Sequence, residues 1–232
     1  MNKPIRTLTI HFQNNLYQDE INHFRGAILQ HLGQEIPIEF HNHEENGYRY
    51  NYPLIQYKRI GGKAAIFCID KGVEMLWHIT ENQKYSLQIG KREELFCISN
   101  IDADRIFVQT WQDTFTYTIR KWLPLNQHNH KKYLSLERMG DRIAMLENIL
   151  TANILSFAKG LGITIQEEIT TSILNIESEN IYRFKNTKMY GFDLHFRSNV
   201  SLPNWIGLGK GVSHGFGTVT RKRKNNEKDN KQ

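Results

Sequence analysis

Two histidines separated by one residue, His41 and His43, form the first group that could do chemistry. In an extended segment their side chains point the same way, with roughly 6–7 Å between their backbone positions. Because histidine titrates near neutrality, one ring could take up a proton while the other donates one across a single phosphodiester. The same three letters recur at His128 and His130, and either pair could be an ordinary solvated loop. A zinc site is a further alternative, although no cysteine lies at zinc-finger spacing from either pair.

The second group is the glycine-rich segment 207–217, with the sequence GLGKGVSHGFG. Glycines allow backbone N–H groups to approach an anion closely, and Lys210 adds a positive charge. The segment is not a dinucleotide fingerprint, because no strand-to-helix unit surrounds it, and it lacks the Gly-Lys-Ser/Thr of a P-loop. Anion binding and a turn that needs glycine for close packing are both consistent with this composition.

The third group interleaves aromatic residues with a cation in the stretch Tyr48-Arg49-Tyr50-Asn51-Tyr52. Such a stretch can stack unpaired bases and hold a phosphate, as single-stranded RNA binders do. The tyrosines could equally pack at a domain edge, and we favour that interpretation for at least one of them.

Hydrophobic patterns in the first half predict the elements that position these groups. We expect strands at 7–12, 54–60, 63–69, 85–89 and 95–98, and helices at 19–33 and 71–80. The pair Gly61-Gly62 suits the tight turn of a hairpin between the second and third strands. The order strand–helix–strand–strand–helix–strand, with one strand to spare, is the ferredoxin-like pattern. It places both helices on one face of an antiparallel sheet and leaves the other face or the loops for a ligand.

The second half has a less regular pattern of helix and strand. We expect a strand at 115–119, a polar connection at 124–132, a helix at 141–159, and β-structure at 164–176 and 182–196. The fold class is therefore α+β. We expect an N-terminal domain at 1–110, a C-terminal domain at 111–220 and a basic, disordered tail at 221–232.

The charge of the chain is concentrated at its end. The net charge is +6, but the residues from Arg221 onward include six basic and two acidic side chains, which leaves only +2 for the rest. A basic tail can grip phosphates or be a solvated end, so charge alone does not decide for nucleic acid. No apolar run is long enough to span a bilayer, so we expect no membrane partner. Cys68 and Cys97 lie in apolar stretches and are expected to be buried thiols in a reducing cytoplasm.

Several motifs together resemble a known family. Gly207-Leu208-Gly209, five residues and Gly215-Phe216-Gly217 resemble the G-h-G-x5-G-h-G signature near the C-terminus of RAMP proteins, with Lys210 as the basic residue inside it. The motifs Phe24–Ala27, His41/His43 and Tyr52–Lys58 are similar to the CRISPR precursor-RNA endoribonucleases of the sixth Cas family. The resemblance covers 8–80 and 190–219 well and the middle in outline. The pair at 41–43, not the one at 128–130, stands where the branch with two loop histidines has its site.

The resemblance implies a fold and a reaction. The fold is two ferredoxin-like (RAMP/RRM-like) domains in tandem, the second degenerate, with a C-terminal glycine-rich loop. The reaction is cleavage on the 3′ side of a CRISPR repeat by the upstream 2′-hydroxyl, which leaves a 2′,3′-cyclic phosphate and a 5′-hydroxyl. Because the substrate supplies the nucleophile, no metal or other cofactor is expected, and the protein supplies acid, base and charge stabilisation.

The resemblance also assigns roles to residues. His41 and His43 become the acid and base, without an assignment of which is which, and Lys58 could stabilise the pentavalent phosphate. The residues expected to contact RNA are Lys58, Arg197, Gly207, Gly209, Lys210, Gly215, Gly217, Arg221, Lys222 and Arg223. The expected partner is CRISPR repeat RNA in precursor crRNA, with other Cas effector subunits and a homodimer as further candidates.

Two other functions are compatible with these motifs. A non-catalytic RAMP subunit that coats guide RNA would share the glycine segment and the fold but would not need His41 or His43. A small nucleotide- or anion-binding enzyme could use the glycine segment alone, and it would bind mononucleotides without binding RNA.

Overall fold

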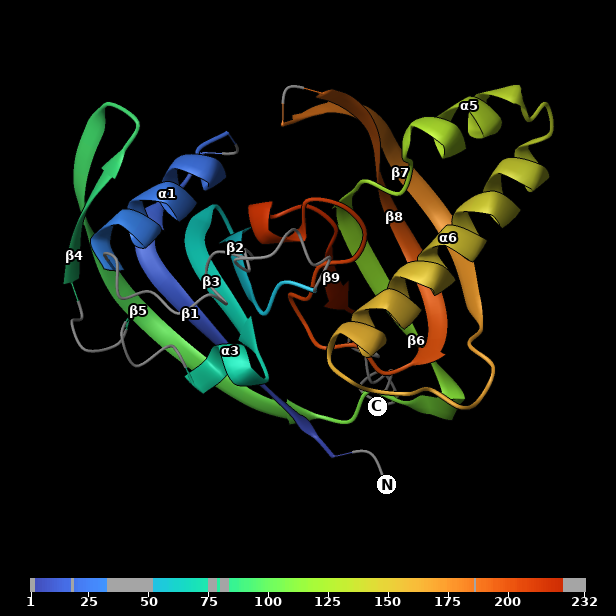
Figure 1. Ribbon diagram of the computed structural model, residues 1–232, viewed down its shortest axis with the longest axis horizontal. Coiled ribbons are helices and arrows are strands. Elements are labelled where there is room, and N and C mark those ends of the chain that lie inside the picture. Colours follow the sequence, from blue (N-terminus) through green and yellow to red (C-terminus); the bar gives the residue numbers. More distant parts are fainter. Residues whose placement is uncertain are drawn as a thin grey trace, which may run out of the picture.

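The computed structural model describes residues 3–17, 19–32, 52–74, 79, 84–185 and 187–222 (Figure 1). The pair His41 and His43, the stretch 48–51 and Arg223 lie outside these ranges. Of the helix expected at 71–80, the structure describes α3 (Lys71–Glu74) and Ile79. No helix in the described part of the chain is long and apolar enough to cross a membrane.

The first domain is built on a five-stranded antiparallel sheet in the order β2-β3-β1-β5-β4. Besides α3, its elements are β1 (Ile5–Asn15), α1 (Ile21–Leu32), β2 (Ile55–Ile60), β3 (Lys63–Ile69), β4 (Lys84–Ile89) and β5 (Arg92–Ile106). All expected strands and the first expected helix are confirmed, although β5 is far longer than 95–98. Without the edge strand β4, the order is that of a ferredoxin-like sheet, so β4 is the spare strand.

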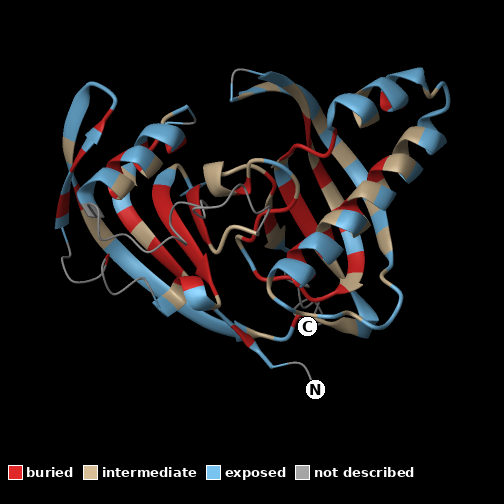
Figure 2. Ribbon diagram, in the orientation of Figure 1, coloured by how far each residue is buried: buried red, intermediate tan, exposed pale blue. Residues whose placement is uncertain are grey.

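Strand β3 is covered on both of its faces, and every residue after the first is buried. Ile66 and Cys68 belong to the same core as Phe24 of α1. Phe67 and Ile69 point to the opposite face and belong to the core of the second domain. Figure 2 shows buried residues concentrated in the strands where the two domains approach each other. The continuous apolar run of β3 is what a strand buried on both faces requires.

The second domain repeats this arrangement with a four-stranded sheet in the order β7-β8-β6-β9. Its elements are β6 (Thr110–Trp122), α5 (Gln127–Ser135), α6 (Met139–Gly160), β7 (Thr171–Phe184), β8 (Thr187–Val200), η1 (Val212–His214) and β9 (Thr218–Arg221). The strand order matches that of β2, β3, β1 and β5, and the long expected helix is present as α6. Two tandem α+β domains dominated by sheets are therefore confirmed.

Two local expectations in this domain were wrong. The polar connection expected at 124–132 contains helix α5, which begins because the Asn126 side chain caps it by accepting a hydrogen bond from the Asn129 amide at 2.7 Å. Of the β-structure expected at 164–176 and 182–196, residues 164–170 are not strand, and the rest belongs to one hairpin of β7 and β8. The turn of the hairpin lies at Lys185, whose φ of 46° is left-handed, so residues 178–181 are paired strand and not a break.

The second domain is degenerate in one place, between β8 and β9. A ferredoxin-like unit has its second helix there, whereas residues 201–217 form only the short 3₁₀ turn η1. Leu202, Ile206, Leu208 and Val212 of this segment are buried, three of them in the main core of the domain. The glycine-rich segment therefore covers the sheet in place of a helix. Arg221, which we expected to begin the tail, is the last residue of β9.

This packing predicts that glycine is required at position 217. Gly217 has a φ of +62°, and an added Cβ would lie 1.9 Å from the Leu208 carbonyl oxygen. Gly217→Ala should lower the free energy of unfolding by at least about 2 kcal/mol, because strain and overlap act together. Gly26→Ala is the control: Gly26 lies in α1 with open space around it, so alanine there should stabilise by about 0.5–1 kcal/mol. Urea unfolding measures both, and equal small effects of the two variants would contradict this account of the segment.

Candidate nucleic-acid interface

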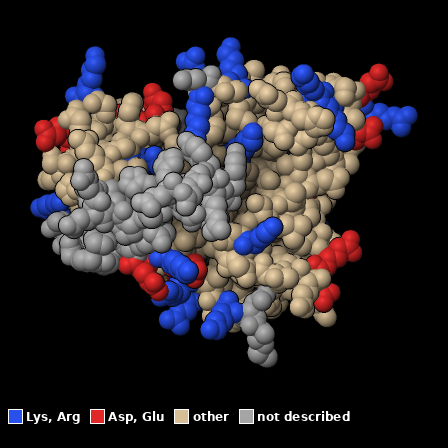
Figure 3. All heavy atoms as spheres, viewed as in Figure 1, with Lys and Arg blue, Asp and Glu red and all other residues tan. Residues whose placement is uncertain are grey.

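A cleft of about 1450 Å³ lies where α1, α5, the β7–β8 hairpin and the glycine-rich segment meet. Its walls carry four cationic side chains, Arg25, Lys185, Lys188 and Lys210. No Asp or Glu is among the described residues that line it. Figure 3 shows basic side chains gathered at this upper edge of the molecule, between the two domains. The cleft therefore has the charge and the size of an anion site that both domains build.

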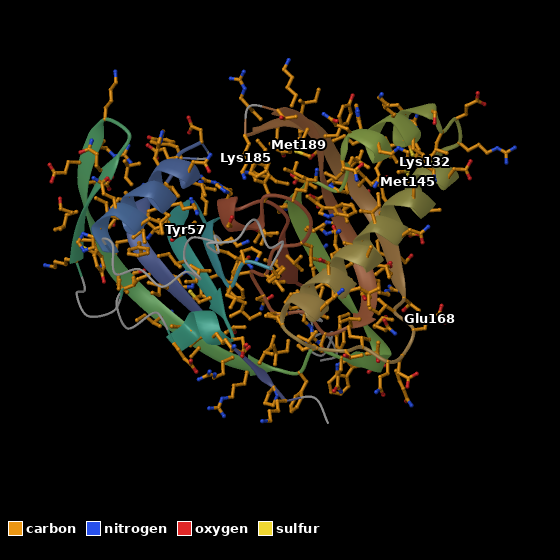
Figure 4. All side chains as sticks on the ribbon, viewed as in Figure 1. Tyr57, Lys132, Met145, Glu168, Lys185 and Met189 are labelled. Atoms are coloured by element: carbon orange, nitrogen blue, oxygen red, sulfur yellow. The ribbon has the colours of Figure 1, made fainter. Side chains whose placement is uncertain are left out.

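The tip of the β7–β8 hairpin contributes two of these cations. Lys185 occupies the left-handed position of the turn, and its Nζ lies 5.8 Å from the centroid of the Phe184 ring. Lys188 is exposed on the other side of the turn. Figure 4 shows Lys185 and Met189 on the part of the hairpin that reaches toward the first domain. An aromatic ring beside two lysines suits a nucleotide, whose base can stack while its phosphate is held.

Arg25 brings a cation from the first domain. It is half-buried on α1, with its guanidinium 5.9 Å from the centroid of the Tyr57 ring. Its Nε is buried without a hydrogen-bond partner among the described residues, and none of their carboxylates forms an ion pair with it. A desolvated cation without an anion is costly, so Arg25 fits a site that an anion completes.

His214 lies within the glycine-rich segment and joins the domains at the cleft. Its Nδ1 is 2.5 Å from Oδ1 of Asn22 on α1, and its ring packs 5.4 Å from that of Phe184. Burial, followed by the charges of Arg25 and Lys185, lowers the pKa of His214 to about 4. His214 is therefore neutral near pH 7, and Nδ1 donates to the amide oxygen of Asn22.

The second histidine pair lies on helix α5 and also lines this cleft. The ring of His130 packs 4.6 Å from that of Tyr190, and its buried Nε2 has no hydrogen-bond partner among the described residues. His128 and His130 are two positions apart on a helix, so their side chains diverge by about 200°. The spacing that would bring two rings to one phosphate in an extended segment does not do so here.

Tyr52 connects the first domain to the glycine-rich segment and lines the cleft. Its hydroxyl donates to the Gly207 carbonyl at 2.7 Å and accepts from Nε2 of Gln56 at 2.8 Å, and its ring packs 5.0 Å from that of Phe157. Burial raises the pKa of Tyr52. This tyrosine packs at the domain edge, as we favoured for at least one member of its stretch.

Lys58 lies in the contact between the domains, away from the surface. It is 0% exposed, its Nζ donates to Oγ1 of Thr218 at 3.2 Å, and burial lowers its pKa to about 7. An RNA phosphate could reach Lys58 only if β2 separated from β9. The expectation that Lys58 contacts RNA does not fit this position, and we leave it out of the interface.

The other predicted cations are divided among three places. Lys210 lies in the cleft. Arg197 and Lys222 lie on either side of Thr116 on the sheet. Arg197 of β8 is paired with Thr116 of β6, and the Lys222 amide donates to the Thr116 carbonyl at 2.9 Å. Arg221 lies at a smaller cavity, because neighbouring residues at the end of a strand point to opposite faces. Arg221 and Lys222 are neighbours in sequence, but they therefore lie at different places on the surface.

The glycines expected to contact RNA have a packing role. An added Cβ would lie 2.4 Å from Val212 at Gly207, 2.9 Å from Trp122 at Gly209 and 2.8 Å from Ile21 at Gly215. Close packing alone thus demands these glycines, as at position 217, while Gly209 also lines the cleft. Contact of these residues with RNA stays a prediction.

Sequence reasoning missed four residues of the cleft: Arg25, Lys185, Lys188 and His214. Lysines in and just after a hairpin turn would have indicated a phosphate-binding site if the sequence analysis had predicted the turn at Lys185. His214 stands inside the glycine signature, where its ring could have been considered with Lys210. In the described ranges, no three His, Cys, Asp or Glu residues gather closely enough to hold a metal ion.

The depressed pKa of His214 predicts a pH dependence of stability. The unfolded chain takes up this proton near pH 6.5 and the folded protein only near pH 4. Protonation therefore favours unfolding, and the contribution of His214 is complete above pH 6.5 and lost as the pH falls toward 4. His214→Gln keeps a donor for Asn22 but cannot titrate, so its unfolding free energy should fall less steeply between pH 6.5 and 4. Equal slopes for the variant and the natural protein would contradict the assignment.

Two family models match this chain: the Cas6b N-terminal domain over residues 3–106 and the Cas6b C-terminal domain over residues 109–222. A crystal structure of Cas6b is similar with a TM-score of 0.84 and 30% identity, covering 94% of this chain and 100% of that one. A crystal structure of the CRISPR RNA processing endoribonuclease Cas6b has a TM-score of 0.72 and 28% identity over the same shares of both chains.

Two further matches were found. An uncharacterized protein of Methanocaldococcus jannaschii is 38% identical over 103 residues, which are 44% of this chain and 69% of that protein. Csf5, a type IV Cas6 crRNA endonuclease, shares the fold, with a TM-score of 0.57 and 12% identity. The two family models together extend over both sheets and over the elements that line the cleft, and they show that the chain belongs to the Cas6b family.

Proposed function

We propose that this chain binds the repeat of a CRISPR precursor RNA in the cleft and cuts it without a metal ion. The observation that carries the proposal is the convergence of Arg25, Lys185, Lys188 and Lys210 from two domains, with no carboxylate among the described lining residues. RNA phosphates would supply the anions that these cations lack. The solved relative named as a CRISPR RNA processing endoribonuclease supports RNA as the ligand.

The cleft offers separate groups for the backbone and for the bases. Lys185, Lys188 and Lys210, which pair with no described carboxylate, can hold successive phosphates, while the Phe184 ring beside Lys185 can stack an unpaired base. His214 carries no charge near pH 7, so it adds hydrogen-bonding capacity without adding to the salt dependence of binding. This division suits recognition of a single-stranded or splayed part of the repeat.

His41 and His43 are our candidates for the acid and the base. Tyr52, nine residues after His43, lines the cleft, so the segment that carries the pair rejoins the described chain at this site. One histidine takes the proton of the 2′-hydroxyl, whose oxygen then attacks the adjacent phosphorus. The other gives a proton to the departing 5′-oxygen as its bond to phosphorus breaks. The products are a 2′,3′-cyclic phosphate and a 5′-hydroxyl, and the step needs no nucleophile from the protein.

A cleavage assay with the repeat RNA from the protein's own genome tests this proposal. We expect cutting at one site in excess EDTA, because acid, base and cations are all side chains. A 2′-deoxy substitution upstream of the cut should abolish cleavage and leave affinity unchanged, since only the nucleophile is removed. Activity that disappears in EDTA and returns with Mg²⁺ or Mn²⁺ would overturn the mechanism. Binding without any cleavage would favour the non-catalytic RAMP subunit.

The same assay tests the histidines under single-turnover conditions. His41→Ala and His43→Ala should each slow cleavage by a factor of about 10²–10⁴ with little change in affinity. His128→Ala and His130→Ala are the matched controls and should have much smaller effects on rate, because a helix directs those rings apart. If the second pair reduces the rate more than the first, the acid and base belong to α5.

A further inference from the structure

A second cavity, of about 610 Å³, lies at the opposite end of strand β6 from the cleft. It is lined by residues around Thr110, where β6 begins, whereas the cleft lies beside Trp122, where β6 ends. The lining residues Trp111 and Phe115 precede Trp122 on this strand by a distance of roughly 20–35 Å along the chain. The cavity is thus a separate feature of the surface, built by the end of β5, the start of β6 and the end of β9.

Aromatic side chains are exposed at this cavity. Phe107 and Trp111 are 44% and 45% exposed, although large aromatic residues normally bury most of their surface. The Trp111 ring is fixed at both ends: its Nε1 donates to Oγ of Ser201 at 2.8 Å, and it meets the Phe115 ring edge-on at 6.5 Å. A rigid, half-exposed indole with its polar atom already satisfied presents its remaining surface to a flat apolar partner.

Two arginines flank these rings, and among the described residues neither has a carboxylate partner. The guanidinium of Arg221 lies 4.2 Å from the centroid of the Phe115 ring, and Arg105 lines the same cavity. Neither forms an ion pair with any described carboxylate, and Asp113 is the one acidic residue in the described lining. Beyond Arg221 the sequence continues through the basic residues Lys222 and Arg223. Flat aromatic surface beside unpaired cations matches a nucleotide, with its base on the rings and its phosphate on the arginines.

We propose that this cavity is a second RNA site, which stacks an unpaired nucleotide of the bound RNA on Trp111 and holds its phosphate with Arg105 and Arg221. The inference rests on the proposed function, since it takes this nucleotide to belong to the RNA that the cleft holds. Given the separation of the two sites, the nucleotide lies several positions away from the scissile phosphate. The site contributes to affinity and takes no part in the chemical step.

The test compares variants for repeat-RNA affinity and for cleavage rate at saturating protein. Trp111→Ala should weaken binding by at least about fivefold, as expected for one lost base stack. Trp111→Phe, which keeps a ring, should retain most of the affinity. Tyr17→Ala is the matched control, because Tyr17 is an aromatic residue 67% exposed outside both cavities, and it should have no effect. The single-turnover cleavage rate should be unchanged in all three.

Variants of the two arginines test the second site independently of Trp111. Arg105→Gln and Arg221→Gln should each lower the slope of log affinity against log salt by about 0.7, the value for one phosphate contact in a single strand. RNA carrying 4-thiouridine should crosslink to the peptide that contains Trp111. Unchanged affinity, unchanged slopes and no such crosslink, in a protein that still binds and cuts the repeat, would overturn the second site alone. A natural protein that does not bind the repeat would overturn the proposed function itself.

Discussion

The two domains are joined by hydrogen bonds from Tyr52 and strand β2 to the glycine-rich segment. Gln56 and Tyr52 together satisfy both backbone groups of Gly207, at 3.0 Å to its amide and 2.7 Å to its carbonyl. Gly215 packs against Tyr57 and Ile21 so closely that no side chain fits. Because the segment replaces a helix, its backbone groups are free to pair with another domain. The cleft lies where this contact between the domains brings α1 beside the β7–β8 hairpin. Its shape therefore depends on the glycines more than on any charged residue.

Charge is distributed differently inside and outside the cleft. Elsewhere on the described surface, three arginines pair with carboxylates: Arg6 with Glu74 at 2.6 Å, Arg92 with Glu20 at 3.0 Å, and Arg120 with Glu177. Such exposed pairs contribute little to stability, but they neutralise the surface. The cations of the cleft have no such partners among the described residues, which leaves a local positive potential on a chain of modest net charge. This local potential attracts a polyanion to the cleft.

The fold of the first domain could be predicted because its patterns are local. Each expected strand was found, and Gly61-Gly62 does turn between β2 and β3, with both φ values positive. The failures occurred where tertiary contacts decide. Gln56 and Lys58 alternate with apolar residues on β2, which is typical of a solvent-facing side, yet the second domain buries both. The close packing of Gly207 and Gly215 at the same contact between the domains could not be read from their spacing either. Arg25 and Lys185 are far apart in sequence, so no spacing could bring them into one site.

The central claim is that the cations of the cleft hold RNA phosphates, and the salt dependence of repeat binding tests it most directly. The variant Lys185→Ala/Lys188→Ala and the variant Lys210→Ala are compared with Lys91→Ala, an exposed lysine at the β4–β5 turn outside the cleft. If each cleft lysine contacts one phosphate, the slope of log affinity against log salt should fall by about 0.7 for each lysine removed. It should stay unchanged in Lys91→Ala. Equal slopes in all of these proteins, or an equal loss in Lys91→Ala, would show that RNA does not bind through this cleft.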